Sequence, residues 1–314
     1  MINVQNQWLE KLVLLPEEVR SQPSKGILAD NLLVSAPSKQ GMPGGLYYVE
    51  KSGWLNPPLI RQLDGLETSG IWLQSNLFLR SLQNMSCLFI VAYSETGQIW
   101  NIINTELKNI HDIIIFKNAL YVVSCGTNEI ARISMTGEIE ERWKFGNGGH
   151  TWHINCLTVW DDRLVASCSG LFETEPYWEL VVGQNTGHAF DVMTGEKLWA
   201  GFNRPHLPAQ DSKGRKYICD SKTQRLLIKD LDDSVREIHF PGTFPKALAW
   251  GKDHLYVGLA RYRFKLEGLE EIASAQIAIL DRETLKIVDY VPLPCSEMYN
   301  IVVVPDDLKV LLPK

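Results

Sequence analysis

Three of the seven histidines in this 314-residue chain stand at the heads of segments that alternate like β-strands. They are His111, His153 and His206, and each leads into a strand-like pattern. Neutral imidazole is a common protein ligand for Zn, Cu and Fe, and three imidazoles leave one position for water. If the three strand heads meet in space, they predict a site for one divalent transition metal that activates water or polarises a carbonyl group.

Other polar residues stand at or beside the same kind of strand head, and they predict the remaining parts of a site. Tyr299 or Glu297 is expected as the catalytic base, and Arg204 or Lys246 as the clamp for an anionic group. The catalytic candidates are therefore Tyr299, Glu297 and Arg204. The candidate ligand-binding residues are Asn109, Trp152, Asn155 and Lys246.

The sequence leaves two other interpretations of the histidines open. The polar heads can form a metal-free site for a polar ligand, or a structural cap in which the imidazoles hydrogen-bond to neighbouring groups. His150 precedes His153 by three residues, a spacing that suits ligands on a helix, but its segment is glycine-rich and leads into a strand. His150 is therefore not assigned as a ligand. Residues 146–149 are interpreted as a link between sheet units and not as a phosphate cradle, because no helix follows them.

The elements that must position these residues are short strands separated by turns. Residues 153–160 alternate with period two, Asp161-Asp162 forms a turn, and Leu164–Cys168 is an almost wholly apolar second strand. The same order recurs along the chain. The predicted strands are 27–36, 44–49, 59–63, 69–73, 87–93, 98–103, 111–116, 120–124, 129–134, 138–143, 153–160, 164–168, 188–192, 196–200, 217–220, 226–229, 235–240, 247–250, 255–259, 276–280, 286–291 and 299–304.

Six such units, spaced by about 40 to 55 residues, predict an all-β fold, the six-bladed β-propeller. The N-terminal unit lacks a first strand, whereas residues 299–304 resemble a first strand with no blade behind it. We expect these two parts to pair, which closes the ring and protects the sheet edges. A seven-bladed ring, with an extra hairpin hidden in residues 70–86, and a different all-β fold are the alternatives.

In a propeller the first strand of each blade lines the central axis, so the strand heads converge at one mouth. Alignment on the following turns places Asn155 and His206 level with His111. His153 lies one pleat higher, level with Asn109. Adjacent layers differ by about 7 Å, so the three imidazoles can still converge.

Residues 1–26 differ in pattern from the rest of the chain. Trp8, Leu9, Leu12 and Val13 fit one face of a helix, and Pro16-Glu17-Glu18 resembles a second helix start. We predict a short helical extension over residues 1–26 and a single propeller domain over residues 27–314. No segment has the apolar length of a membrane span or the pattern of a signal peptide, so a soluble cytoplasmic protein is expected.

Composition narrows the classes of function. The formal net charge is −6 and the basic residues form no long run, which argues against nucleic-acid partners. Six cysteines without a Cys-x-x-Cys motif are expected as buried free thiols in a reducing compartment. Cys156 faces away from His153 and is not assigned as a nucleophile. No phosphate-binding or dinucleotide-binding motif occurs, so no nucleotide cofactor is expected.

The strand heads carry a resemblance to a known family. His153-Ile-Asn-Cys-Leu and Arg204-Pro-His-Leu-Pro resemble the His-x-Asn and Pro-His-x-Pro blade heads of an uncharacterised bacterial six-bladed propeller family, over most of residues 85–305. Asn109 stands where that family has histidine, and His111 where it has asparagine. The resemblance implies the fold and no activity. By fold analogy alone, the site is similar to that of the six-bladed amidating lyases, which hold zinc on the axis with three histidines.

These patterns together predict a small-molecule enzyme with a His-rich site on the propeller axis, and we expect a metal-assisted lyase, hydrolase or cyclase of secondary metabolism. Its substrate would be a small or peptide-like molecule. The alternative is a non-catalytic propeller scaffold that binds a protein or a sugar through its loops. Two long insertions, 172–184 and 261–273, are expected to form a lid over the mouth or a contact in a homo-oligomer.

Overall fold

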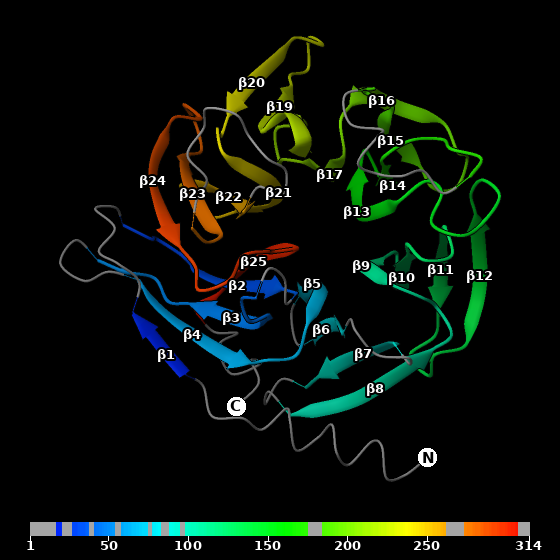
Figure 1. The fold of residues 1–314 in the computed structure, drawn as a ribbon, viewed down its shortest axis with the longest axis horizontal. Coiled ribbons are helices and arrows are strands. Elements are labelled where there is room, and N and C mark those ends of the chain that lie inside the picture. The colour runs from blue at the N-terminus through cyan, green and yellow to red at the C-terminus, as the bar shows by residue number, and fades with distance from the viewer. Residues whose placement is uncertain are drawn as a thin grey trace.

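The protein is an all-β, six-bladed propeller in the computed structural model, with its blades arranged around a central hub (Figure 1). The predicted fold class is thereby confirmed. The structure describes residues 17–20, 27–37, 41–53, 58–74, 77–82, 88–94, 98–174, 184–261 and 273–306.

The first three blades hold the N-terminal half of the chain. Blade 1 has five strands, in the spatial order β1 (Glu17–Arg20), β4 (Leu59–Asp64), β3 (Gly45–Val49), β2 (Asn31–Ala36) and β25 (Asn300–Val304). Blade 2 comprises β5 (Thr68–Gln74), β6 (Leu77–Leu82), β7 (Leu88–Tyr93) and β8 (Ile99–Thr105). Blade 3 comprises β9 (Ile110–Phe116), β10 (Ala119–Ser124), β11 (Glu129–Ile133) and β12 (Ile139–Lys144).

The strands of the other three blades run in chain order from hub to rim, as in blades 2 and 3. Blade 4 comprises β13 (Ile154–Trp160), β14 (Arg163–Cys168), β15 (Gly187–Asp191) and β16 (Lys197–Phe202). Blade 5 comprises β17 (Pro205–Gln210), β18 (Lys216–Asp220), the 3-10 turn η1 (Ser221–Thr223), β19 (Arg225–Lys229) and β20 (Val235–His239). Blade 6 comprises β21 (Thr243–Trp250), β22 (His254–Arg261), β23 (Gln276–Asp281) and β24 (Ile287–Pro292).

The ring closes through the last strand of the chain, as the sequence predicted. β25 pairs antiparallel with β2, and Leu33 lies opposite Val302 in this ladder. The C-terminal strand therefore supplies the innermost strand of the blade that the N-terminal half begins (Figure 1). This pairing satisfies an edge that would otherwise face the hub with open backbone groups.

Blade 2 contains a strand that the sequence pattern did not reveal. β6 falls in residues 70–86, where the alternative of a seventh blade placed an extra hairpin. It pairs with β5 and β7 inside blade 2, so the ring has six blades and not seven. Arg80 interrupts the apolar character of this strand, but it is fully buried against Asp64, which explains why sequence alternation alone missed the strand.

The N-terminal extension needs one correction. Most of residues 1–26 lie outside the described residues, but Glu17–Arg20 form β1, a strand, where the sequence suggested a helix start. β1 runs antiparallel to β4, with Val19 opposite Ile60. The outer edge of blade 1 offers open backbone donors and acceptors, and pairing with them outweighs local helix preference.

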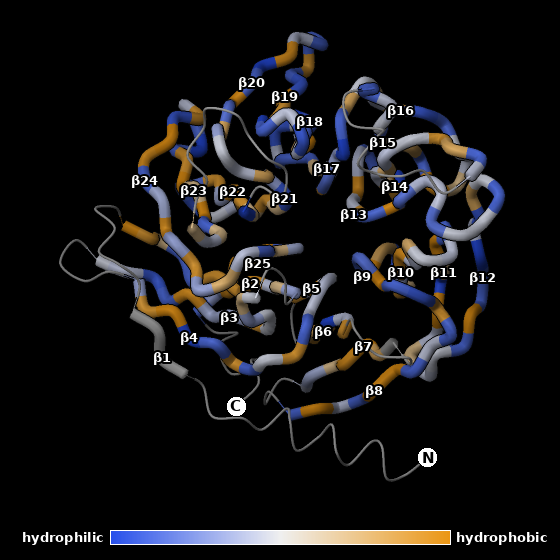
Figure 2. The backbone as a smooth tube through the Cα atoms, viewed as in Figure 1, coloured by the Kyte–Doolittle hydropathy of each residue, from blue (hydrophilic) through white to orange (hydrophobic). Residues whose placement is uncertain are grey.

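The core lies between neighbouring blades, because the middle strands of each blade bury both faces. Val122 and Val123 of β10 point to opposite faces and are both fully buried. Figure 2 shows hydrophobic segments along such strands, for example β7 and β10. Apolar runs therefore mark the middle strands, whereas the outer strands carry charge, as in Glu140 and Glu141 of β12.

Hydrogen bonds from one blade to the next tie the hub together. Ser69 Oγ donates to Ile110 O at 2.6 Å, Asn155 Nδ2 donates to Pro205 O at 2.8 Å, and Ser221 Oγ donates to Pro245 O at 2.5 Å. Between blades 3 and 4, Leu157 N donates to the buried carboxyl of Asp112 at 2.8 Å. Burial raises the pKa of Asp112 to about 7. These bonds fix the innermost strands relative to one another, which a site built from several blades requires.

Gly70 permits the close approach of blades 2 and 3 at the hub. A Cβ atom at this position would lie 2.7 Å from both Asp112 Cα and Ile113 N, which are backbone atoms. We expect Gly70→Ala to lower the free energy of unfolding by about 1–3 kcal/mol through overpacking, measured by urea denaturation. The matched control is Gly53→Ala, because no atom lies within 4 Å of a Cβ there. Equal stability of the two variants would contradict the close packing inferred at Gly70.

Candidate metal centre at the hub

A β-bulge at the head of the innermost strand aims side chains into the hub. In blade 3 the pairing of β9 with β10 passes from Asp112 to Ile110 and skips His111. The same break skips Asn155 in β13 and Lys246 in β21. A bulge leaves one residue unpaired and redirects its side chain, and bulges are common beside active sites. His111 and Asn155 thus occupy equivalent positions, as the sequence alignment predicted.

The residue just before these strands has a left-handed backbone conformation in three consecutive blades. The φ angles of Asn109, His153 and Arg204 are 53°, 50° and 54°. Asparagine and histidine adopt this conformation more readily than most residues. Asn109-x-His111 and His153-x-Asn155 therefore place the same two residue types in exchanged order on one scaffold. Because of this exchange, the histidine at the bulge of blade 3, His111, lies beside the histidine that precedes the first strand of blade 4, His153.

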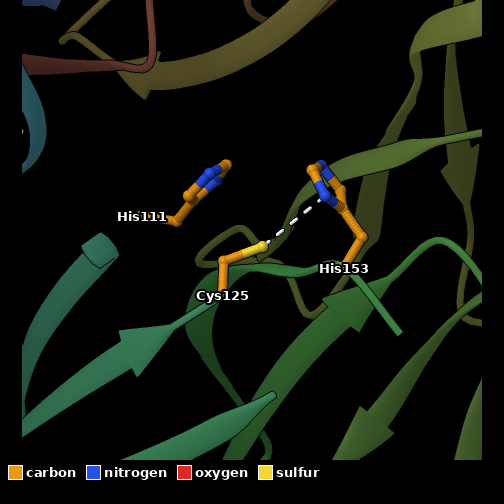
Figure 3. Close-up of side chains that lie close together, drawn as sticks. All are labelled: His111, Cys125 and His153. Carbon is orange, nitrogen blue, oxygen red and sulfur yellow. Dashed lines mark hydrogen bonds between the residues drawn. The ribbon is translucent and has the colours of Figure 1, made fainter. Parts of the chain in front are cut away.

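His111 and His153 meet at the hub, where Cys125 joins them (Figure 3). Their ring centroids are 5.4 Å apart, and Cys125 Sγ lies 3.5 Å from His153 Nδ1. One ligand atom from each of the three residues lies within 4.8 Å of the others. His111 and Cys125 are buried, and His153 is partly buried. In the described part of the chain, these three side chains form a group of histidine and cysteine residues that lie close enough together to hold a metal ion.

One pair of the donor atoms has the separation expected on a tetrahedral transition metal. Zn–S bonds of about 2.3 Å and Zn–N bonds of about 2.0–2.1 Å place the two donors about 3.6 Å apart at a tetrahedral angle. The distance of 3.5 Å between Cys125 Sγ and His153 Nδ1 matches this separation. Two imidazoles and one thiolate form a donor set that suits Zn, Cu or Fe better than Mg or Ca.

Cys125 is the member of this group that the sequence did not reveal. It follows directly after β10, and its backbone N–H donates to Asn109 O at 3.1 Å, which ties it to the head of β9. Gly126 allows the approach, since a Cβ there would lie 3.0 Å from Lys108 O. The signal in the sequence was weak, because a cysteine ending an apolar strand is usually a small core residue.

The surroundings of His153 favour the neutral form of its imidazole, which is the form that binds a metal. Burial lowers the pKa of His153 well below its ordinary 6.5, and the neighbouring His111, His150, His206 and Arg204 lower it further. A protonated imidazole cannot ligate a metal, so a low pKa keeps the nitrogen lone pair available at neutral pH.

This low pKa predicts a pH dependence of stability. In the metal-free protein, we expect the free energy of unfolding to fall as the pH drops below about 6.5, because the unfolded chain protonates His153 while the folded chain keeps it neutral. His153→Gln lacks this proton uptake. The difference in the free energy of unfolding between wild type and the variant should therefore shift against wild type as the pH is lowered. Urea denaturation between about pH 5 and 8 measures this difference. A constant difference over that range would contradict a low pKa at His153.

A chain of ring contacts continues from the cluster around the hub. The rings of His111 and Tyr299 lie 5.1 Å apart, and Lys246 Nζ lies 4.5 Å from the centre of the Tyr299 ring. Lys246 also forms an ion pair of 2.9 Å with Glu297, and both side chains are almost completely buried. The structure thus brings three of the predicted residues, Tyr299, Lys246 and Glu297, together beside the histidines.

His206 lies at the same mouth but holds different partners. Its Nδ1 lies 2.8 Å from Ser221 Oγ and 3.1 Å from Arg204 O, and its ring packs 5.6 Å from that of Phe244. The group of three donors contains Cys125 in place of the predicted His206. His206 is still near enough to lower the pKa of His153.

Three of the predicted ligand-binding residues make internal contacts around the hub. Asn155 Nδ2 donates to Pro205 O, and its Oδ1 accepts from Ser167 Oγ at 2.5 Å. The Trp152 ring packs against Phe145 and Phe190 of the surrounding core. Asn109 holds the Cys125 backbone through its carbonyl oxygen. The insertions at 172–184 and 261–273 lie largely outside the described residues.

The family can be assigned from a sequence comparison. Residues 82–311, more than two thirds of the chain, match the model of a domain of unknown function, DUF4915. The chain belongs to the DUF4915 family. This membership agrees with the resemblance to an uncharacterised propeller family drawn from the blade heads. No curated protein sequence matches the chain.

Solved structures share the propeller fold with this DUF4915 protein at low sequence identity. A protein of unknown function from Bacteroides caccae is 12% identical, with a TM-score of 0.56 over 88% of this chain and 100% of that one. A chain of the nidogen/laminin complex is 11% identical, with a TM-score of 0.59 over 88% and 98%. Luciferin-regenerating enzyme is 12% identical, with a TM-score of 0.54 over 74% and 78%. At these identities the similarity shows the fold alone.

The described part of this DUF4915 chain contains no helix with the length and apolar character needed to cross a membrane.

Proposed function

We propose that this DUF4915 protein is a metal-dependent enzyme that acts on a small anionic molecule at the propeller mouth. The observation that carries the proposal is the convergence of His111, Cys125 and His153, whose ligand atoms lie within 4.8 Å of one another. His111 and Cys125 lie at the same end of the β9–β10 hairpin, whereas His153 comes from the next blade, so the packing of blades 3 and 4 at the hub is needed to bring the three donors together.

The three donors suit a catalytic metal site more than a structural one. Structural zinc sites usually have four protein ligands, whereas catalytic sites have three and keep one position for water or substrate. When bound, a divalent Zn, Cu or Fe ion would supply a Lewis acid that polarises a substrate oxygen. His111, Cys125 and His153 would hold it, and Tyr299, against the His111 ring, is positioned to hold or release a proton.

Cationic groups beside the cluster favour an anionic substrate. Arg204 lies near His153 and lowers its pKa. Burial first, and then the charge of Arg204, lower the pKa of Lys222 to about 8. Two cations held near each other attract an anion such as a carboxylate. Lys246 forms a buried ion pair with Glu297. We assign anion binding to Arg204 and Lys222 because both are cationic and lie near each other.

We propose a lyase, hydrolase or cyclase reaction of secondary metabolism, without a nucleotide cofactor, in a soluble cytoplasmic protein. Each of these reactions can proceed through polarisation of a carbonyl group or activation of water, which is the chemistry that a three-ligand site supplies. A homo-oligomer remains a proposal, and no nucleic-acid or membrane partner is proposed.

The test combines metal analysis with a substrate screen. Protein purified without a polyhistidine tag should contain about one equivalent of Zn, Cu or Fe by mass spectrometry, and His111→Ala/His153→Ala should contain almost none. Turnover of members of a panel of small carboxylate esters, lactones and amides should require the metal and disappear in the double variant. A protein that binds no metal, and whose ligand binding is unchanged by the double substitution, would favour the non-catalytic scaffold.

A further inference from the structure

A fourth imidazole, that of His150, lies beside the cluster at the hub. Its Nε2 lies within hydrogen-bonding distance of His153 Nδ1, and the two rings are 4.5 Å apart. His153 Nδ1 is the same atom that lies 3.5 Å from Cys125 Sγ. His150 therefore reaches the nitrogen that the metal would use, from a position that is partly exposed to solvent.

The backbone that carries His150 differs from the strands that carry the other donors. Residues 146–150, which we call the glycine arm, contain three glycines with positive φ, at 59°, 83° and 61°. A Cβ atom at Gly148 or Gly149 would have no other atom within 4 Å, so nothing packs against these two residues there. The arm is held before and after these glycines, by packing of Gly146 on the Trp152 ring and by a hydrogen bond of 3.2 Å from Thr151 Oγ1 to Gly148 O.

We infer that His150 is an exchangeable fourth ligand of the metal, which completes a closed resting site and leaves when a substrate binds. The inference rests on the proposed function. Two imidazole nitrogens on one tetrahedral metal lie about 3.3 Å apart. His150 Nε2 must therefore move away from His153 Nδ1 by about 1 Å and also toward His111 and Cys125, since His150 is not one of the three residues whose ligand atoms lie within 4.8 Å of one another. The open glycines of the arm allow such a shift, whereas the hub strands are fixed by hydrogen bonds between blades.

An exchangeable ligand explains how one site can be both closed and catalytic. With His150 bound, the metal has four protein ligands and no open position. With the glycine arm displaced, three protein ligands would remain, and the fourth position would be open to an anionic substrate held by Arg204 and Lys222. The arm is also linked to the 172–184 insertion, because Asn147 Nδ2 donates to Glu173 O at 3.2 Å.

The test uses Co(II) as the probe in the full-length, tag-free protein. Four-coordinate Co(II) gives intense visible bands, and a thiolate ligand adds a charge-transfer band in the near ultraviolet. Wild type should show both, and should bind added imidazole weakly. His150→Ala should keep the thiolate band, bind Co(II) on the order of tenfold to a hundredfold more weakly, and bind added imidazole at least about tenfold more tightly. His239→Ala, on the exposed end of β20, is the control and should match wild type.

The outcomes separate this inference from the proposed function. If wild type binds no Co(II), the proposed function fails and this inference with it. If wild type and His150→Ala show the same spectrum and the same affinity for imidazole, the metal site stands and the role of His150 is overturned. X-ray absorption of the Zn-loaded wild type provides a measurement that does not depend on folding of the variant. One sulfur with outer-shell scattering from three imidazole rings, unchanged in His206→Ala, supports the inference, whereas one sulfur with outer-shell scattering from only two imidazole rings overturns it.

Discussion

Replacing Cys125 with serine should reduce the affinity for Zn on the order of a hundredfold. Structural zinc sites with four ligands gain about 10–16 kcal/mol in total, which is about 2.5–4 kcal/mol for each ligand. A hydroxyl is a poor substitute for thiolate, because its proton is not released at neutral pH and its oxygen is a harder donor. The dissociation constant is measured by competition with a chelator of known affinity, in reducing buffer.

The chain offers a matched control for this substitution. Cys168 ends the second strand of blade 4, is fully buried like Cys125, and lies 3.3 Å from a nitrogen of His188. Because this pair belongs to no group of three donors among the described residues, Cys168→Ser should leave Zn affinity unchanged. Equal affinities of wild type and Cys125→Ser would show that the contact between Cys125 and His153 is a thiol–imidazole hydrogen bond and not part of a metal site.

Replacing Asp64 with alanine should lower the free energy of unfolding by about 3–5 kcal/mol, the cost of leaving one charge of a buried ion pair without its partner. Arg80 and Asp64 form this pair between blades 1 and 2, and neither side chain has measurable exposure. Arg80 Nη2 donates to Asp64 Oδ1 at 2.9 Å, and a second bond joins Nη1 to Oδ2. Urea denaturation measures the loss.

An exposed ion pair is the comparison for this effect. Lys213 and Glu283 lie 2.7 Å apart with exposed fractions of 51% and 71%. Glu283→Ala should cost less than about 1 kcal/mol, because water screens both charges. A similar loss in Glu283→Ala and Asp64→Ala would mean that the charge of Arg80 is solvated in a way that the fold does not show.

The sequence was sufficient to predict most of the fold. The alternation of residues 153–160, the turn at Asp161-Asp162 and the apolar strand that follows reappear as β13 and β14. The closure by β25 was also predictable, because a first strand without a blade and a blade without a first strand complement each other. β6 was not, since Arg80 lies in it, and sequence alone does not show that a distant Asp64 compensates the buried charge.

The site was predictable in outline and not in its ligands. The strand heads were expected to converge, and His111, His153 and Tyr299 do meet. Cys125 was missed because its place beside His153 depends on the turn between β10 and β11, which brings it against the head of the next blade. The hydrogen bond of Asn155 to the neighbouring blade was equally hidden, since pattern gives the face of a side chain but not its partner.

The most direct measurement is X-ray diffraction from crystals of the Zn-loaded protein, with data collected on both sides of the metal absorption edge. We predict an anomalous peak at the hub, within about 2.0–2.4 Å of an imidazole nitrogen of His111, Nδ1 of His153 and Sγ of Cys125. Anomalous peaks found only at surface residues, with these three side chains unchanged and no density between them, would contradict the metal centre on which the proposed function depends.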